Sequence, residues 1–404
     1  MIERPVYLKQ LEKWRDKRII KVISGIRRAG KSTLLQLFAQ RLLNDDVLPQ
    51  QIIEINLEDL GNESLREYHA LYRFIEDHIL PGKMNYIFID EIQNCPSFEK
   101  AVDSLLLKPN IDLYLTGSNA YFLSSELATL LAGRYIEIRL YPLSFAEFFR
   151  ARHAPQDTVA ADRAFADYLR YGSFPYVANL IGDEDAVHTY LEGIYNTILI
   201  KDVAQRERIR DITLLENIIQ TLASNLGSPI SAKRIADTLT SSGRKVSHLT
   251  IDRYLHALTD AFIFYHVPRY DIKGRQYLKN LGKYYIADTG LRRLLIAEKE
   301  PGLGHQLENI VYLELIRRYS RVNIGKLDST EVDFVASNGD ALAYYQVSAS
   351  VLDERTRTRE LAPLKRLADN YPKILLTLDT IGRDTNDGGI IQRNLLDWLL
   401  KGED

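Results

Sequence analysis

Short apolar runs alternate with helical patterns over the first 140 residues. Apolar runs that predict strands lie at residues 18–24, 51–57, 86–92, 111–118 and 135–140. Apolar residues with helical spacing lie between them, at residues 31–43, 64–80 and 97–107. Runs such as residues 87–89 have no polar alternation, which is typical of strands buried on both faces. Strands that alternate with helices predict an α/β fold with a doubly wound parallel sheet.

The pattern changes after residue 140. Residues 141–225 are mainly helical, and the glycine and proline of "YGSFPYV" (171–177) interrupt them with a turn or a helix entry. Two more helices are expected at residues 231–239 and 247–261, followed by two or three strands around a polar turn at residues 273–274. Residues from about 300 onward mix helix and strand. We therefore expect four parts, at residues 1–140, 141–205, 206–290 and 291–404.

A glycine-rich segment joins the first expected strand to the first expected helix. It fits the pattern G-x-x-x-x-G-K-[ST] at every fixed position. Glycines let backbone N–H groups curl around a phosphate, and the N-terminus of the next helix adds partial positive charge. Lys31 is expected to reach the β- and γ-phosphates of ATP, and the Ser32 hydroxyl to bind Mg²⁺. The expected ATP contacts are Gly25, Ile26, Arg27, Arg28, Ala29, Gly30, Lys31, Ser32 and Thr33.

Two acidic residues, Asp90 and Glu91, close the third expected strand. Ligands bind at the carboxyl edge of a parallel sheet. Asp90 is therefore expected to hold the Mg²⁺ through water, and Glu91 to orient and polarise the attacking water. The fourth expected strand ends with "LTGSN", where a polar side chain can contact the γ-phosphate or the water. Ser118 and Asn119 are both candidates for this catalytic role, and the register of the strand decides between them.

Four segments carry a family resemblance: "GIRRAGKST", "FIDEIQN", "LTGSNAYFLSSELATLLAGRY" and "LYPLSFAEFF". With them the chain resembles the AAA+ ATPases of a bacterial and archaeal group that joins the ATPase to a C-terminal domain of unknown function, DUF4143. The resemblance implies an AAA+ core at residues 1–140, a helical lid at residues 141–205, and Mg²⁺-dependent ATP hydrolysis. It also implies that Arg134, just before the fifth expected strand, is an arginine finger acting on the ATP of a neighbouring subunit. Such a finger requires a homo-oligomer, for which AAA+ proteins imply a hexameric ring.

The part at residues 206–290 has the element order of a winged helix-turn-helix. Ser231 and Ser247 are expected to cap the two helices. The expected small core consists of Ile235, Leu239, Ile251, Leu255 and Leu258. The residues left for the outward or N-terminal part of the second helix are Ser247, His248, Thr250, Arg253 and Tyr254. In DNA-binding members this helix enters the major groove, and wing cations contact phosphates, here Lys273, Arg275 and Lys279. Other winged helices pair proteins or link domains, so DNA contact is one of two interpretations.

The last part resembles the PD-(D/E)xK nuclease fold, as the C-terminal domain of the family does. Glu308 lies in an expected helix and Asp333 in the strand "TEVDFVAS", both as that nuclease pattern requires. The next strand departs from the pattern because Gln346-Val347-Ser348 stands where Glu-x-Lys is needed. A glutamine brings no charge to a metal, and a serine cannot replace the lysine cation. We therefore expect a degenerate nuclease-like α/β restriction-endonuclease fold, with Glu308, Asp333 and Gln346 as its remnant site.

Composition and charge narrow the class of protein. The net charge of -2 excludes a polycation that coats nucleic acid. Residues 201–300 nevertheless hold 17 Lys and Arg against 11 Asp and Glu, which reflects either chance variation or an anionic partner. A single cysteine excludes a disulfide framework. No run approaches the ~18 apolar residues of a membrane span, and the N-terminus has no signal-peptide core. The expected location is the cytoplasm.

Three functions fit these patterns. The first is an oligomeric AAA+ ATPase that uses ATP and Mg²⁺ to remodel DNA or to move along it. The second is a nucleotide-gated switch or assembly ATPase that acts on protein partners. The third is an ATP-dependent metal nuclease, which the loss of Glu-x-Lys makes the weakest of the three.

Overall fold

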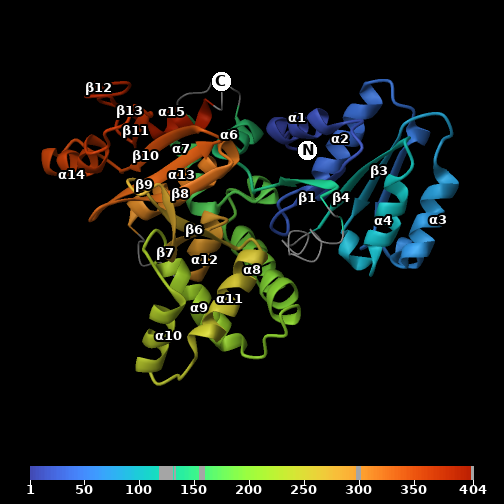
Figure 1. Ribbon diagram of the computed structural model, residues 1–404, viewed down its shortest axis with the longest axis horizontal. Coiled ribbons are helices and arrows are strands. Elements are labelled where there is room, and N and C mark those ends of the chain that lie inside the picture. Colours follow the sequence, from blue (N-terminus) through green and yellow to red (C-terminus); the bar gives the residue numbers. More distant parts are fainter. Residues whose placement is uncertain (118–130, 132, 154–159, 297–301, 402–404) are drawn as a thin grey trace. The chain divides into compact units, whose positions relative to one another are not determined.

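The computed structural model describes residues 1–117, 131, 133–153, 160–296 and 302–401 (Figure 1). The chain divides into two compact units. The first comprises residues 1–142 and 260–262, and the second comprises residues 143–259 and 263–404. None of the helices in the described part of the chain combines the length and the apolar character that a transmembrane helix needs.

The first unit is built on a five-stranded sheet in the order β2-β3-β4-β1-β5, and every neighbouring pair is parallel. Its strands are β1 (Ile20–Ser24), β2 (Ile52–Asn56), β3 (Asn85–Asp90), β4 (Ile111–Thr116) and β5 (Tyr135–Arg139). Its α-helices are α1 (Pro5–Trp14), α2 (Lys31–Asn44), α3 (Tyr68–His78) and α4 (Phe98–Leu106). Short 3-10 helices are η1 (Pro49–Gln51), η2 (Leu60–Arg66) and η3 (Ile92–Asn94). The expected parallel α/β sheet is confirmed.

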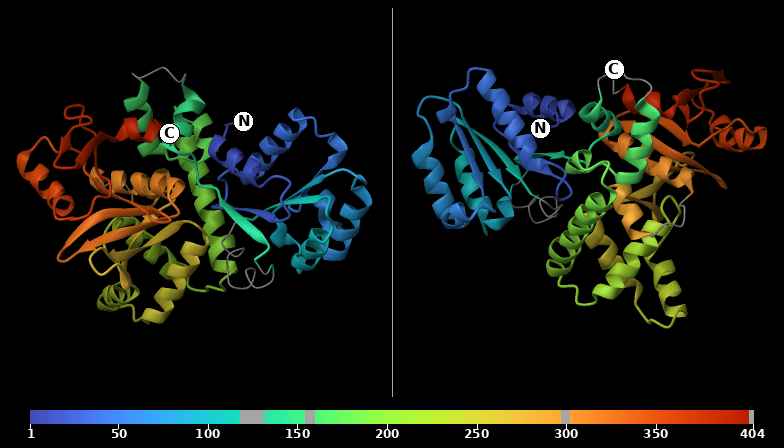
Figure 2. Two further views of the ribbon diagram at one scale, coloured as in Figure 1. Left: turned by 45° about the horizontal axis from the view of Figure 1, so that its top comes forward. Right: turned by 180° about the vertical axis from the view of Figure 1, so that it is seen from behind.

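Helices cover both faces of this sheet (Figures 1 and 2). α1 and α2 lie on one face, whereas α3 and α4 lie on the other. The connection from β1 to β2 runs across the sheet in one direction, and the connections from β2 to β3 and from β3 to β4 run back. Because parallel crossovers are right-handed, opposite directions place their helices on opposite faces. This winding brings the carboxyl ends of β1, β3 and β4 to one edge.

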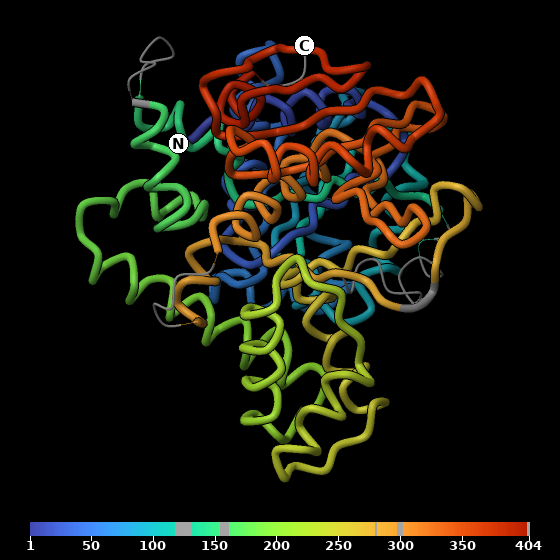
Figure 3. Tube along the Cα trace, turned by 90° about the vertical axis from the view of Figure 1, so that its left-hand side faces the viewer, coloured from blue at the N-terminus to red at the C-terminus, as the bar shows by residue number. Residues whose placement is uncertain are grey.

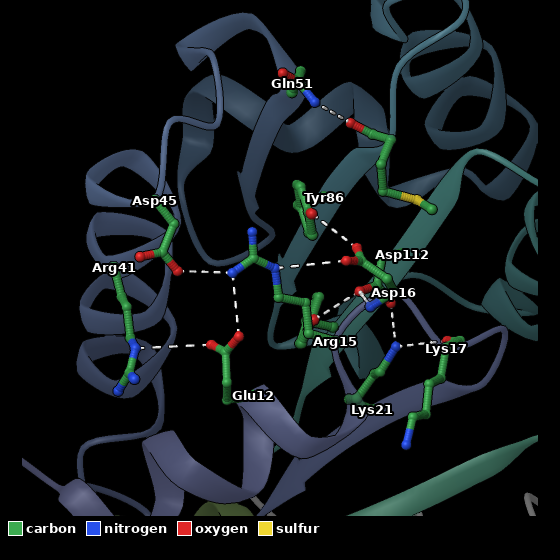
Figure 4. Close-up of polar contacts among 12 residues, drawn as sticks. Glu12, Arg15, Asp16, Lys17, Lys21, Arg41, Asp45, Gln51, Tyr86 and Asp112 are labelled. Atoms are coloured by element: carbon green, nitrogen blue, oxygen red, sulfur yellow. Dashed lines mark hydrogen bonds and ion pairs between the residues drawn. The ribbon is translucent and has the colours of Figure 1, made fainter.

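β1, β3 and β4 are buried along their whole length. Two of these strands carry a charged residue near the amino end, Lys21 in β1 and Asp112 in β4, and the Lys21 ammonium donates to the Asp112 carboxylate (Figure 4). Asp112 also accepts the backbone N–H of Asp16 at 2.9 Å and the Tyr114 hydroxyl at 2.8 Å. Burial lowers the pKa of Lys21 and raises the pKa of Asp112, and the charge of each partner opposes the shift. The Lys21–Asp112 pair is thus a buried ion pair that links β1 and β4 near the amino edge of the sheet.

The second unit contains an eight-stranded mixed sheet in the order β12-β13-β11-β10-β9-β8-β6-β7. Its strands are β6 (Phe264–Asp271), β7 (Gln276–Ile286), β8 (Arg321–Leu327), β9 (Thr330–Asn338), β10 (Ala341–Val347), β11 (Lys373–Thr377), β12 (Asn386–Asp387) and β13 (Ile390–Asn394). Helices before the sheet are α6 (Phe145–Arg152), α7 (Ala160–Tyr171), η5 (Pro175–Asn179), α8 (Glu184–Thr197), the π-helix η6 (Ile198–Gln205), α9 (Ile212–Ser224), α10 (Ala232–Ser241) and α11 (His248–Asp260). Later helices are α12 (Thr289–Leu295), α13 (Leu303–Arg318), α14 (Glu354–Lys365) and α15 (Leu395–Leu400).

The two faces of the larger sheet pack against different helices. Tyr344 belongs to a core cluster that includes Leu361 and Leu364 of α14. The next residue, Tyr345, contacts the ring of Trp398 in α15 and bonds to the Tyr319 hydroxyl beyond the end of α13. Successive residues of a strand point to opposite faces. α14 therefore covers one face, and α13 and α15 cover the other.

The β6–β7 hairpin joins the helix pair to the large sheet. β6 pairs antiparallel with β7 and parallel with β8, so the hairpin expected to form a wing is also an edge of the sheet. α9, α10 and α11 extend together beyond the strands (Figure 3). Strands on both sides of residue 290 thus share one sheet, and the division of the chain into four parts stays a prediction.

Candidate functional site

The loop between β1 and α2 requires glycine at its start for two reasons. Gly25 has φ of 141°, which L side chains rarely adopt. A Cβ added to Gly25 would lie 2.1 Å from the backbone oxygen of Leu140, which follows β5. Gly30 has φ of 97° and stands directly before α2. The loop is therefore held close against the end of β5 while it turns into the helix.

Lys31 points back into this loop from the first turn of α2. Its ammonium donates to the carbonyl oxygens of Gly25 at 3.0 Å and Ile26 at 3.3 Å. Lys31 is buried, whereas the neighbouring Ser32 is exposed. An ammonium inside the loop, a hydroxyl at its rim and the N-terminus of a 14-residue helix match the needs of a phosphate with its Mg²⁺.

The acidic pair lies at the same edge of the sheet. Asp90 ends β3, and Asp90 and Glu91 are each only 8% exposed. Glu91 has left-handed backbone angles, φ 53° and ψ 50°, which are uncommon for this residue type. The Gln93 side-chain amide donates to the Glu91 carboxylate. The structure thus brings the expected metal residue and the expected water-orienting residue to the edge that carries the phosphate loop.

Thr116 is a polar residue of this edge that we did not expect from the sequence. It ends β4, is fully buried, and donates its hydroxyl to the Asp90 carboxylate. The same hydroxyl oxygen accepts the backbone N–H of Glu91 at 2.9 Å. Thr116 therefore fixes both acidic residues relative to β4. The catalytic candidates Ser118 and Asn119, which follow it by two and three residues, lie outside the described residues.

Arg27 and Arg28 differ in their surroundings. The Arg27 guanidinium lies 3.5 Å from the Glu58 carboxylate, beyond the end of β2, whereas Arg28 is exposed. Glu58 also lines a cavity of about 420 Å³ together with Arg66 and Asn94. Asn94 follows Asp90 and Glu91 by only a few residues, so this polar cavity opens at the carboxyl edge of the sheet.

Arg134 stands at the opposite edge of the sheet from the phosphate loop. Its backbone oxygen accepts the N–H of Ile20 at the start of β1, whereas the loop begins after Ser24 at the end of that strand. Five strand residues span about 16 Å. The Arg134 side chain is 51% exposed and lies 3.4 Å from Asp103 of α4. Arg134 is therefore too far from the phosphate loop of its own chain to contact a nucleotide there.

The helix pair matches the expected order, with one correction. The Ser231 and Ser247 hydroxyls accept backbone N–H groups from Arg234 at 3.2 Å and Thr250 at 3.1 Å, as N-caps do. Ile235, Ile251, Leu255 and Leu258 are buried, and Leu239 is half-buried. Ser247, His248 and Arg253 are exposed and Thr250 is half-buried, but Tyr254 is buried, 4% exposed, rather than outward. One helical turn separates Tyr254 from Ile251 and Leu258, which places all three on the core face.

The residues of the expected wing lie at the tip of the β6–β7 hairpin. Lys273 and Arg275 are exposed, and the Lys273 ammonium lies 2.6 Å from the Asp328 carboxylate. The side chain of Lys279 lies outside the described part of the chain. Two cations of the wing are thus accessible, one of them already paired.

Asp333 contacts Gln346 and lies near Glu308, the other two residues expected to form a remnant nuclease site. Asp333 of β9 accepts the backbone N–H of Val347 at 2.9 Å, and its own N–H donates to the Gln346 side chain at 3.3 Å. Glu308 of α13 is near enough that its charge raises the pKa of Asp333, after burial as the largest cause. Ser348 bonds to the backbone oxygen of Ser350 at 3.0 Å and brings no cation. A buried lysine does lie in this cluster, Lys283 of β7, which we did not expect.

The chain is similar to two protein families over different parts of its length. Residues 17–149 match an AAA domain family, and residues 162–301 match a domain of unknown function, DUF8612. The first match covers the phosphate loop, Asp90, Glu91 and Arg134. The second covers the helix pair and the β6–β7 hairpin, so the family matched there is DUF8612, and the expected DUF4143 relationship stays a prediction.

Two relatives are similar over most of the chain. An uncharacterized protein of Haemophilus influenzae is 40% identical over 402 residues, which cover 99% of each chain. The uncharacterized protein MJ1544 of Methanocaldococcus jannaschii is 30% identical over 355 residues, which cover 85% of this chain and 77% of that protein. Among solved structures, the Walker-type ATPase PABY2304 of Pyrococcus abyssi has 18% identity and a TM-score of 0.49, with 73% of this chain and 96% of that chain covered.

Proposed function

We propose that this chain hydrolyses ATP with Mg²⁺ and uses the energy to remodel DNA or to move along it. The chain belongs to the family that joins an AAA domain of the P-loop ATPase class to DUF8612. The observation that carries the ATPase part is the meeting of Lys31, Asp90 and Glu91 at one edge of the sheet. Two buried carboxylates and a buried ammonium at the same edge of the sheet are suited to a phosphate group and its cation rather than to an apolar ligand.

The proposed reaction uses these residues in separate roles. The Lys31 ammonium would neutralise phosphate charge, while the Ser32 hydroxyl would hold Mg²⁺ directly and the Asp90 carboxylate would hold it through water. Glu91 takes a proton from water as the water oxygen bonds to the γ-phosphorus. The bond from the γ-phosphorus to the β–γ bridging oxygen breaks, and its electron pair leaves with ADP. Thr116 keeps Asp90 and Glu91 in position through its hydroxyl.

The DNA part of the proposal is supported by the exposed side of the helix pair and hairpin. His248 and Arg253 of α11 and Lys273 and Arg275 of the hairpin are exposed in one unit. The surrounding hundred residues have six more basic than acidic side chains, as 17 Lys and Arg stand against 11 Asp and Glu. Basic side chains on a helix and an adjacent hairpin are suited to a groove and its flanking phosphates.

Duplex DNA is expected to stimulate the ATPase rate several-fold, and the stimulation is expected to vanish at high salt because phosphate contacts release counterions. The measurement is the steady-state rate of phosphate release with and without DNA, at about 50 and 300 mM salt. An ATPase rate that is indifferent to DNA would contradict the DNA proposal and favour a nucleotide-gated switch that acts on protein partners.

Two variants separate contact at this surface from a general charge effect. Arg253→Ala combined with Arg275→Ala is expected to remove most of the stimulation and to leave the DNA-free rate unchanged. Arg383→Ala is the matched control because Arg383 is also a partly exposed arginine of the second unit, 3.3 Å from Asp397. Equal losses in both variants would count against the helix pair as the DNA surface.

We also propose that the chain forms a homo-oligomer, which we expect to be a hexameric ring. The position of Arg134 supports this proposal. A half-exposed arginine that cannot reach its own nucleotide is suited to that of a neighbour. Arg134→Ala is expected to lower kcat by about 10³-fold, the effect of a lost arginine finger. Mixing this variant with inactive Lys31→Ala protein should restore part of the rate, since the second variant still supplies Arg134. No recovery after the two variants are co-refolded would contradict action in trans.

The finer nature of the C-terminal half is also a proposal. We infer a winged helix that continues into a nuclease-like sheet of the DUF4143 type, in which catalysis is lost. The support is the co-location of Glu308, Asp333 and Gln346 without the Glu-x-Lys pair. Intact duplex DNA after incubation with Mg²⁺ or Mn²⁺, with and without ATP, is the expected result, and cleavage would favour the metal nuclease instead.

A further inference from the structure

Four charged residues from three elements of the second unit meet beside the larger sheet. Lys283 belongs to β7, Glu308 to α13, and Glu331 and Asp333 to β9. Glu331 and Asp333 are two positions apart in a strand, so both side chains leave the same face. We call this set the Lys283 cluster.

The lysine lies between the carboxylates. Its ammonium is 3.0 Å from an oxygen of Glu308 and 2.5 Å from an oxygen of Glu331. The Lys283 side chain is only 5% exposed, and that of Glu308 is 11% exposed. The Tyr285 hydroxyl donates to the same Glu308 oxygen, which fixes the carboxylate from a second direction. Lys283 is thus an internal cation that is held by two acids and shielded from solvent.

The pKa of Asp333, the third acid of the cluster, depends on the same neighbouring charges. Burial raises the pKa of Asp333 well above its ordinary value, the Glu308 charge raises it further, and Lys283 opposes both effects. Burial alone would lower the pKa of Lys283, but the charges of Glu308, Asp333 and Glu331 outweigh burial and raise it. The lysine therefore stays charged, and its charge is what makes three neighbouring carboxyl groups tolerable here.

The cluster does not fit the metal site that a nuclease-like fold implies. Gln346 has its amide engaged, because it accepts the Asp333 N–H and donates to Glu360 at 2.9 Å. Across the described ranges, no three acidic, histidine or cysteine side chains are placed to hold a metal ion. The space between Glu308 and Glu331, where a cation would neutralise both, is filled by the Lys283 ammonium.

We propose that Lys283 is the resident cation of this cluster and excludes divalent metal ions from it. The C-terminal half then needs no metal ion for its folding or its stability. The lysine occupies the space between Glu308, one of the residues expected to form the nuclease-like site, and Glu331. The acids of the cluster then serve to hold β7, β9 and α13 together. The proposal depends on neither ATP hydrolysis nor DNA binding.

The test is thermal unfolding of the nucleotide-free protein with 1 mM EDTA or about 1 mM Mn²⁺. The wild-type Tm is expected to be the same in both buffers. Lys283→Met removes the cation and leaves the carboxylates, so the Tm in EDTA should fall by about 10 °C. Mn²⁺ should restore about half of that loss, since the vacated space offers carboxylate ligands to a hard cation.

Lys273→Met is the matched control, because Lys273 also pairs with an acid, Asp328 at 2.6 Å, but is 62% exposed. It should change Tm by less than about 2 °C, with no effect of Mn²⁺. A saturable rise of the wild-type Tm with Mn²⁺ that Glu308→Gln abolishes would overturn the proposal. If Lys283→Met does not fold in either buffer, Lys283→Arg, which keeps the charge, should fold and remain indifferent to Mn²⁺; a Mn²⁺-stabilised Lys283→Arg protein would equally overturn it.

Discussion

Glu91→Gln is expected to leave ATP binding intact and to lower kcat by about 10³-fold, within the range measured for the loss of a general base. Glutamine has the shape of glutamate and can keep the contact with the Gln93 side chain, but it cannot take a proton from water. The left-handed backbone of Glu91 and its N–H bond to Thr116 do not depend on the carboxylate, so the surrounding edge of the sheet should stay in place. Binding of a fluorescent ATP analogue and steady-state phosphate release together check the prediction.

Lys31→Ala provides the contrast for this measurement. It removes the ammonium that lies inside the phosphate loop, so ATP binding itself should be lost. Glu91→Gln is expected to bind ATP without hydrolysing it, whereas Lys31→Ala is expected not to bind ATP. Together the two variants would separate ATP binding from ATP hydrolysis at this edge of the sheet. Hydrolysis by Glu91→Gln at the wild-type rate would refute the role of Glu91 in orienting water.

Asp112→Asn is expected to destabilise the first unit by about 3–5 kcal/mol, which is a large part of the stability of a typical domain. Asparagine keeps an oxygen that can accept from Tyr114 and from the N–H of Asp16, so the change isolates the charge. Without the carboxylate, the fully buried Lys21 ammonium keeps only the Lys17 carbonyl at 2.8 Å as a hydrogen-bond acceptor in this set. Denaturant unfolding of the wild type and the variant measures the difference.

A second substitution shows whether the loss comes from the stranded lysine. Lys21→Met in the Asp112→Asn background removes the unpaired charge and should recover most of the lost free energy of unfolding, because a neutral pair of similar shape is often as stable as a buried ion pair. The control is Lys273→Met, which breaks an exposed pair and should cost at most about 1 kcal/mol. A double variant no more stable than Asp112→Asn alone would refute this account of the pair.

The sequence was sufficient for the parts of the site that depend on consecutive residues. The phosphate loop, the acidic pair and the strands that carry them each follow from a local pattern, because the backbone of a buried strand places its last residue at the sheet edge. The parallel sheet with helices on both faces also follows, since right-handed crossovers leave few ways to wind alternating strands and helices.

The sequence was insufficient where side chains from distant strands meet. The contacts of Thr116 do not follow from the sequence, because the end of β4, and hence its register against β3, is not visible in an apolar run. The Arg27 contact with Glu58 depends on where the chain goes after β2. A signal did exist for Lys21 and Asp112, since a charge inside an otherwise apolar strand requires a buried partner.

The residues expected to form a nuclease-like site are a second case in which the sequence was insufficient. The absence of a lysine after Gln346 is plain in the sequence, but the presence of Lys283 from β7 depends on the irregular pairing of β6 and β7 and on the cover that α13 provides. No spacing rule links a residue of the hairpin to an acid in the strand 48 positions later. The absence of a lysine from β10 therefore does not exclude a lysine that β7 places in the same cluster.

The shared β6–β7 hairpin has a consequence for how this chain can change during evolution. Since β6 is hydrogen-bonded to β8, a gene rearrangement with a breakpoint near residue 290 would leave β8 with an open, unpaired edge. Open edges invite pairing with other chains, and natural proteins avoid them. The helix pair and the C-terminal sheet are consequently expected to be inherited together as one module.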